Sequence, residues 1–173
     1  MLSQDDIAPL QEAIIRELTY FCTHLPFKDK DDVTVVLKGQ LLVEEQLVAY
    51  VKGRLARPEK IQRFMFDRYL CLAEALTPDS HYNWIFEACR KLNGIRNHMS
   101  HQLSPADIDK LIKEFTAYVK KHAGVMLDST SFKCNLADFR TAVLALYASL
   151  RNFDRPIGRS IRIKTLLEGA KGA

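Results

Sequence analysis

The sequence predicts an all-α protein, a single-domain bundle of about six helices with an up-and-down core. Three observations predict this fold. Apolar residues recur every three or four positions along most of the chain. Proline, glycine and short polar turns divide the chain into segments of helical length. The β-branched stretch VTVVL continues into LLVEEQLVAYV with the same helical period, so we expect no strands.

Three helices are predicted in the first half of the chain. Ser3, with Asp6 three residues later, resembles a capping box, and the helix that it opens should end near His24. The second helix is longer and should span about residues 31–55. Pro58 suits the first turn of the third helix. The apolar stripe that should face the core from the second helix consists of Val33, Leu37, Leu41, Val48, Val51 and Leu55.

Three more helices are predicted in the second half. Ser80 can cap the fourth, which should run to about His101. The sequence SPAD opens the fifth helix, which Gly124 should close, and the sixth should span about residues 136–153. We therefore expect residues 1–153 to form one helical domain, followed by a basic and flexible tail over residues 154–173.

The composition narrows the classes of protein. No apolar run reaches about 18 residues, and the first ten residues, MLSQDDIAPL, lack the basic and apolar regions of a signal peptide. These features predict a cytoplasmic protein that does not contact a membrane. The four cysteines are widely spaced in apolar helical segments, which is typical of buried free thiols rather than of a disulfide framework or a zinc site. We expect no metal and no cofactor.

Charge is distributed unevenly along the chain. Residues 1–51 carry nine acidic and four basic side chains, whereas residues 52–101 carry nine basic and five acidic ones. Residues 151–173 add six basic side chains against two acidic ones. This asymmetry suits a polyanionic ligand such as RNA, and it equally suits a solvated surface.

The fourth predicted helix has two different faces. At about 100° per residue, one face is apolar and should pack into the bundle. Its residues are Trp84, Ala88, Leu92, Ile95, Met99 and Leu103. The opposite face carries Arg90, Asn93, Asn97 and His101, and Arg96 lies at the border between the two. Because lysine and glutamate ordinarily coat a solvated helix, this polar face is either a site or a set of exposed and loop-capping side chains.

Gly94 interrupts the same helix. Glycine inside a helix costs about 1 kcal/mol relative to alanine, which suggests that another backbone approaches closely there. An antiparallel neighbour at this point could be a second copy of the same helix. We therefore expect a homodimer through the helix that carries Gly94.

The segment Arg96-Asn97-His98-Met99-Ser100-His101 resembles the signature of the HEPN superfamily, in which an arginine and a polar residue precede three variable residues and a histidine. The context KLNGIRNHMSH is similar to the LNxIRNxxAH-type segments of bacterial members. GQLLVEEQL, at residues 39–47, resembles the long early helix that packs beside the motif. The resemblance covers about residues 31–122. Some branches of the superfamily resemble the mannitol operon repressor.

The resemblance implies a metal-independent endoribonuclease that dimerises and cleaves RNA to a 2′,3′-cyclic phosphate, with Arg96, Asn97 and His101 as catalytic residues. It also implies a toxin of a toxin-antitoxin or antiphage system, with an antitoxin protein as a partner. The alternative is a non-catalytic HEPN-like or mannitol-repressor-like regulator that binds protein or nucleic acid.

The residue types fit RNA cleavage by the 2′-hydroxyl, which needs a proton acceptor, a proton donor for the leaving oxygen and positive charge near the phosphate. Imidazole can act as acid or base near neutral pH, so His101 suits either role. Arg96 offers a planar donor fork for phosphate oxygens, and Asn97 can orient the imidazole or the phosphate. One chain supplies a single acid-base group, and the partner's His101 would supply the second.

Several other side chains are secondary candidates. His98 lies among the variable positions of the motif, and His98 with His101 lacks an acidic or cysteine ligand at metal-binding spacing. Asn93 belongs to the polar face. Glu44 interrupts the apolar stripe of the second helix, where it can pair with Arg96, pair with a lysine or reach solvent.

Two aromatic residues near the start of the fourth helix are further candidates. Tyr82 and Trp84 can stack on RNA bases, although the position of Trp84 on the apolar face favours packing.

Overall fold

The computed structural model describes residues 4–25, 31–61, 64–78, 80–101, 107–123 and 135–151. These residues form six α-helices and two short 3-10 turns without a strand, which confirms the predicted all-α bundle. The helices are α1 (Gln4–His24), α2 (Asp32–Gly53), α3 (Phe66–Ala75), α4 (Asn83–His101), α5 (Ile108–Ala123) and α6 (Asn135–Arg151). The predicted tail, Ser3, Leu103 and Gly124 lie outside the described residues.

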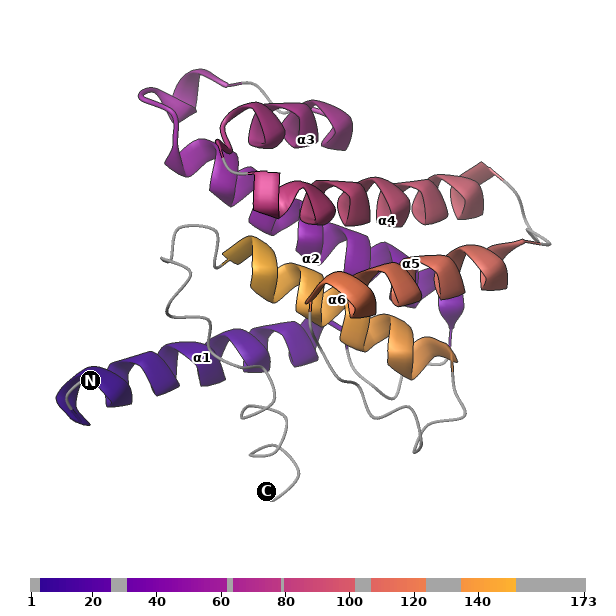
Figure 1. Ribbon diagram of the computed structural model, residues 1–173, viewed down its shortest axis with the longest axis horizontal. Helices are drawn as coiled ribbons and strands as arrows, with labels where there is room; N and C mark the ends of the chain where they lie inside the picture. The colour runs from indigo at the N-terminus through magenta and orange to yellow at the C-terminus, as the bar shows by residue number, and fades with distance from the viewer. Residues whose placement is uncertain are drawn as a thin grey trace.

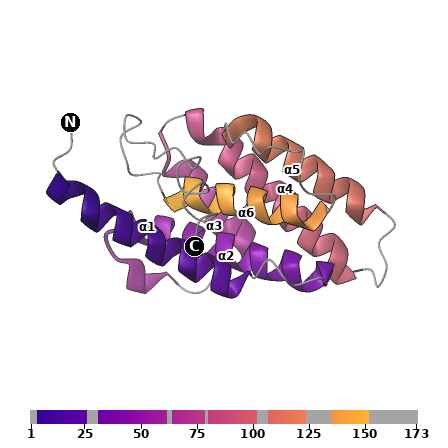
Figure 2. The same cartoon turned by 90° about the horizontal axis from the view of Figure 1, so that it is seen from below.

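Helix α2 lies at the centre of the bundle, where it packs against α6, α4, α3 and α1. Helices α4 and α5 lie side by side, and α3 lies over the first half of α4 (Figure 1). The start of α2 and the end of α4 lie at the same end of the bundle, on the right of Figure 1. Figure 2 shows α1 along the opposite side from α4 and α5, with its first turns projecting beyond the other helices. None of the helices in the described ranges has the length and apolar character needed to cross a membrane.

A local cap fixes the start of α2. The carboxylate of Asp31 accepts hydrogen bonds from the backbone N–H of Thr34, at 3.0 Å, and from the Thr34 hydroxyl. These hydrogen bonds favour the ionised carboxylate and lower the pKa of Asp31. The predicted second helix is therefore observed, with its end at Gly53 instead of residue 55.

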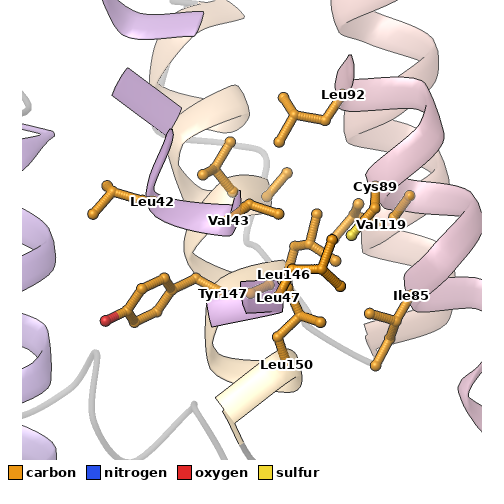
Figure 3. Close-up of a cluster of buried hydrophobic side chains, with 14 of the residues drawn as sticks. Leu42, Val43, Leu47, Ile85, Cys89, Leu92, Val119, Leu146, Tyr147 and Leu150 are labelled. Carbon is orange, nitrogen blue, oxygen red and sulfur yellow. The ribbon is translucent and has the colours of Figure 1, made fainter. Parts of the chain in front are cut away.

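Helices α2, α4, α5 and α6 form the part of the core that Figure 3 shows, and α1 and α3 add further buried residues, among them Phe21 and Tyr69. Val43 and Leu47 of α2 lie beside Leu146 and Leu150 of α6 in this cluster, and Leu42 lies on its outer side. From the other side, α4 contributes Ile85, Cys89 and Leu92, and α5 contributes Val119. Each buried aliphatic side chain of this kind contributes about 1.5–3 kcal/mol relative to exposure. The buried face of α4 therefore holds its opposite face in a fixed orientation.

The predicted core stripe of α2 is wrong in its first half. The exposed fractions of Val33, Leu37 and Leu41 are 46%, 36% and 60%. The residues that face the core there include Val35, Val36, Leu42 and Val43. Helix α2 is apolar on two sides, and α4 and α6 cover the side that the sequence pattern did not select.

The second half of the stripe is covered by α3 and the segment before it. Val48 shares a pocket with Phe64 and Tyr69, and Val51 is buried. The predicted start of the third helix at Pro58 is also wrong: residues Pro58–Lys60 form a single 3-10 turn, and α3 begins at Phe66. The backbone is extended at Ile61 and at Met65, the residue directly before the helix. A helix of ten residues is too short to cover the whole stripe.

The cysteines differ in exposure. Cys89 is buried as expected, and its burial raises the pKa of the thiol. Cys22 and Cys71 are exposed, which corrects the expectation that they are buried. Each lies on the solvent side of an amphipathic helix, α1 or α3. Cys134 lies outside the described residues.

Gly39 marks the close packing of α2 on α6. A β-carbon at Gly39 would lie 3.3 Å from Cγ1 of Val143, which is tighter than ordinary van der Waals contact. We expect Gly39→Leu to lower the free energy of unfolding by about 1–3 kcal/mol because the added side chain overpacks this contact. Urea denaturation followed by circular dichroism measures the change. The matched control is Gly53→Leu, at the exposed end of α2, where a β-carbon meets no atom within 4 Å. Equal losses in the two variants would contradict this account of Gly39.

Candidate active site at the end of α4

The motif residues occupy the last turns of α4. Leu92 and Ile95 are buried in the core and fix the helix there. Arg96 and Asn97 are half-buried, and His101, the last residue of the helix, is exposed. Asn97 precedes His101 by four positions, so the two side chains lie on the same side of α4, one turn apart. The helix therefore brings the three predicted catalytic residues to one end of the bundle.

Arg96 and Asn97 form a hydrogen-bonded pair. Nη1 of Arg96 donates to Oδ1 of Asn97 at 2.8 Å. One turn later, Oγ of Ser100 donates to the backbone oxygen of Arg96, also at 2.8 Å. Among the residues that the structure describes, no carboxylate lies within 4.0 Å of the Arg96 guanidinium. The guanidinium is thus oriented by a neutral amide and keeps its full positive charge for a ligand.

The histidines of the motif differ in their surroundings. His98 is half-buried and follows Lys91, which lies over the Tyr118 ring of α5, by seven positions, so the helical period puts it toward α5; His101 is exposed. Within the described ranges, no hydrogen bond holds the imidazole of His101. The ring of His101 is therefore accessible to a ligand or to a second chain.

The predicted placement of Asn93 on an outward polar face is wrong. Asn93 is buried, and its Nδ2 donates to Oδ1 of Asp67 on α3 at 3.0 Å. One turn earlier, Arg90 forms an ion pair with Glu74 of α3 and another with Glu87. The first part of the polar face is therefore a contact with α3, because that helix places two carboxylates opposite Arg90 and Asn93. Only the part beyond Asn93 remains open.

The structure does not bring Glu44 to Arg96. The carboxylate of Glu44 is half-buried and accepts a hydrogen bond from Nε2 of Gln40 on the same helix, at 3.2 Å. It lines the pocket between α2 and α3 with Leu41 and Val48. Glu44 therefore does not neutralise the arginine of the motif.

Gly94 is exposed, and a β-carbon at this position would meet no neighbouring atom of the described residues within 4 Å. Gly39 differs from Gly94, because a β-carbon at Gly39 would press on the side chain of Val143. The backbone approach predicted at Gly94 is therefore not made by any part of the chain that the structure describes, and the proposed contact with a second copy stays a prediction.

One side of the bundle is left uncovered beside the motif. Helix α3 packs on both α2 and α4 but begins only at Phe66, and beyond its start no other described helix covers Val33, Leu37 and Leu41, which are exposed. We call this surface the open face; it comprises Val33, Leu37 and Leu41 of α2 and Gly94, Asn97 and His101 of α4. Met65, 80% exposed, lies at its edge where α3 begins.

The sequence did not reveal the α2 part of the open face. Its three apolar residues were assigned to the core because their spacing is helical. The apolar residues of α2 span a wider arc of the helix than one buried stripe occupies. This width is the sequence signal that some of them are exposed.

Two further observations concern metal binding and the comparison with known proteins. In the described part of the chain, no three His, Cys, Asp or Glu side chains gather in a way that could hold a metal ion. No protein-family model, curated protein or solved structure matches the chain.

Proposed function

We propose that the chain is a HEPN-like, metal-independent endoribonuclease that acts as a homodimer. The observation that carries the proposal is the Arg96–Asn97 pair, hydrogen-bonded at 2.8 Å, beside an exposed His101 on the open face. A fixed cation and an accessible imidazole are the two groups that phosphate-ester cleavage by a neighbouring hydroxyl requires.

Each group has a distinct role in the proposed reaction. The guanidinium of Arg96 binds the oxygens of the scissile phosphate and stabilises the negative charge of the transition state. Asn97 holds the guanidinium in place through its side-chain oxygen. His101 accepts the proton of the 2′-hydroxyl or donates one to the leaving 5′-oxygen. The phosphorus–5′-oxygen bond breaks as the 2′-oxygen attacks, leaving a 2′,3′-cyclic phosphate and a 5′-hydroxyl.

Dimerisation through the open face would complete the site. Contiguous exposed apolar side chains usually mark a contact surface, and Val33, Leu37 and Leu41 follow one another at four-residue spacing on α2. A two-fold axis near Gly94 would bring two copies of α4 together without a side chain in the way. His101 and the partner's His101 would then serve as the general base and the general acid.

The proposed cellular role is that of a toxin in a toxin-antitoxin or antiphage system, with a protein antitoxin as its partner. Growth after induced expression addresses this role. Toxicity that disappears in both Arg96→Ala and His101→Ala supports it, and toxicity that persists in either folded variant contradicts it.

The alternative proposal is a non-catalytic regulator that binds protein or nucleic acid through the same surface. The observation that favours it is the exposure of His101, whose imidazole the described chain does not orient. A regulator would bind RNA or a protein without producing cleaved ends.

RNA cleavage in EDTA tests the proposed function. The purified protein should cleave single-stranded RNA at an undiminished rate in excess EDTA, because both reacting groups are side chains. Mass spectrometry of the fragments should find 2′,3′-cyclic phosphate and 5′-hydroxyl ends. Cleavage that stops in EDTA, or fragments with 5′-phosphates, would contradict the mechanism. Arg96→Ala serves as the inactive control.

A further inference from the structure

A cluster of aromatic rings lies along the edge between α4 and α5, away from α3. Trp84 of α4 stacks on His122 of α5, with ring centroids 6.1 Å apart and the planes inclined by 14°. Tyr118 lies against the same imidazole, at 4.3 Å between centroids. Nζ of Lys91 lies 5.3 Å from the centre of the Tyr118 ring. We call Trp84, Lys91, Tyr118 and His122 the aromatic edge.

Contacts within the chain hold the rings of the aromatic edge in place. Nδ1 of His122 is 2.8 Å from the backbone oxygen of Tyr118, which fixes the imidazole across the two larger rings. Trp84 and Tyr118 are partly buried against the core, so their inner parts are held rigidly. His122 is exposed and forms the outer layer of the stack. The exposed imidazole of His122 therefore presents a ring to solvent that the larger rings hold from behind.

The edge leads toward the motif. Trp84, Lys91 and His98 follow one another at seven-residue spacing, so they lie along one line of α4. The distance from Trp84 to His98 along the helix is about 21 Å at 1.5 Å per residue. His101 follows His98 by three positions, about 4.5 Å further along the axis, on the neighbouring side of α4 that belongs to the open face. An extended chain that starts at the rings would therefore reach the motif after a few nucleotides.

The charge of this edge suits a nucleic acid. The last turn of α5 carries Lys120, Lys121 and His122. Lys120 forms an ion pair with Asp138 of α6 at 3.0 Å, so Lys121 is the lysine of this turn that adds positive charge. Glu87 is the nearby carboxylate on α4, and it lies within ion-pair distance of both Arg90 and Lys91, which offset its charge. Burial raises the pKa of Tyr118, so its hydroxyl stays neutral and adds no repulsion for phosphate.

The same edge does not suit a protein partner. Among the described residues, the large apolar side chains that are exposed lie elsewhere, on α1, on α2 and at the start of α3. Aromatic rings flanked by a lysine are the arrangement on which bases of single-stranded RNA stack, largely without sequence preference.

We propose that the aromatic edge binds a base of the single-stranded RNA substrate a few nucleotides from the phosphate that is cleaved, with Lys91 contacting the intervening backbone. This inference rests on the proposed function for its substrate class. It adds a binding site, on the opposite side of α4 from α3, to the residues of the motif.

The fluorescence of Trp84, the single tryptophan of the chain, reports directly on this site. The full-length His101→Ala variant is titrated in EDTA with a short single-stranded oligoadenylate, which stays uncleaved. We expect saturable quenching, because a base that stacks on the rings alters the surroundings of the indole. Adding His122→Ala or Lys91→Ala should raise the midpoint of the titration roughly fivefold or more. Lys91→Ala leaves the three rings in place, so it covers the case in which His122→Ala disturbs folding.

The chain offers a matched control in His24. Its ring lies against Tyr20 at 4.2 Å between centroids, and its Nδ1 is 2.8 Å from the backbone oxygen of Tyr20, as in the pair of Tyr118 and His122. His24→Ala should leave the midpoint unchanged. Absence of quenching would assign the edge to packing or to a protein contact and overturn the proposal, as would equal midpoints in folded His122→Ala, Lys91→Ala and His24→Ala.

The result of this titration can be distinguished from the result of the RNA cleavage assay that tests the proposed function. Quenching that depends on His122, in a chain whose wild type does not cleave RNA, would support the binding site and overturn the ribonuclease. Cleavage by the wild type without any quenching would do the reverse.

Discussion

Replacing His101 by alanine is expected to lower the rate of RNA cleavage by roughly a hundredfold to ten-thousandfold. In the proposed dimer the substitution removes both the general acid and the general base. The free energy of unfolding should stay nearly unchanged, because His101 is the exposed last residue of α4. Initial rates on end-labelled RNA measure the first effect, and urea denaturation measures the second.

Two further histidine variants serve as controls for His101→Ala. His24→Ala removes an exposed histidine on α1 and should leave the rate unchanged. His98→Ala removes the half-buried neighbour in the motif and should cost much less than His101→Ala, because His98 faces α5 instead of the open face. A folded His101→Ala protein that cleaves RNA at the wild-type rate would contradict the assignment of His101 as a catalytic residue.

Replacing Leu41 by glutamate is expected to convert the dimer to monomers and to abolish most of the cleavage. Leu41 is 60% exposed in the single chain, so the charged side chain can remain in solvent and the monomer should fold. Near a two-fold axis, each glutamate would face the other or an apolar partner surface, and burying an unpaired charge is costly. Light scattering measures the mass, and the RNA assay at the same protein concentration measures the activity.

The matched control is Ile15→Glu, because Ile15 is 62% exposed and lies on α1, away from the open face. This variant should remain dimeric and active. Gly94→Leu approaches the same interface from α4, where the chain itself leaves room for the side chain. Dimers of Leu41→Glu and Gly94→Leu with wild-type activity would move the interface elsewhere.

The positions of most helices were predictable because their start and stop signals are local. Asp31 caps α2 through Thr34, and such a signal is readable from a few neighbouring residues. The orientation of α2 was not predictable in the same way. Its apolar residues cover two sides, and only the packing of α4, α6 and the short α3 decides which of them is buried.

The candidate site was also predictable only in part. Arg96, Asn97 and His101 follow from their spacing along one helix, and the structure places them at one end of the bundle. Asn93 was misplaced because the partner that buries it, Asp67, lies 26 positions away on a helix whose start the sequence did not reveal. Glu44 was considered as a partner of Arg96, but its hydrogen bond is to Gln40, one turn earlier on its own helix.

In the proposed dimer one cleavage site needs His101 from both chains, and mixing of subunits distinguishes this arrangement from a site within one chain. Wild type and His101→Ala are combined in varied proportions, unfolded and refolded together at constant total concentration, with wild type alone as the control for recovery. Mixed dimers then hold a single His101. We expect cleavage to fall as the square of the wild-type fraction, because only dimers with two histidines cleave RNA. Cleavage that falls in simple proportion to the wild-type fraction would contradict this arrangement.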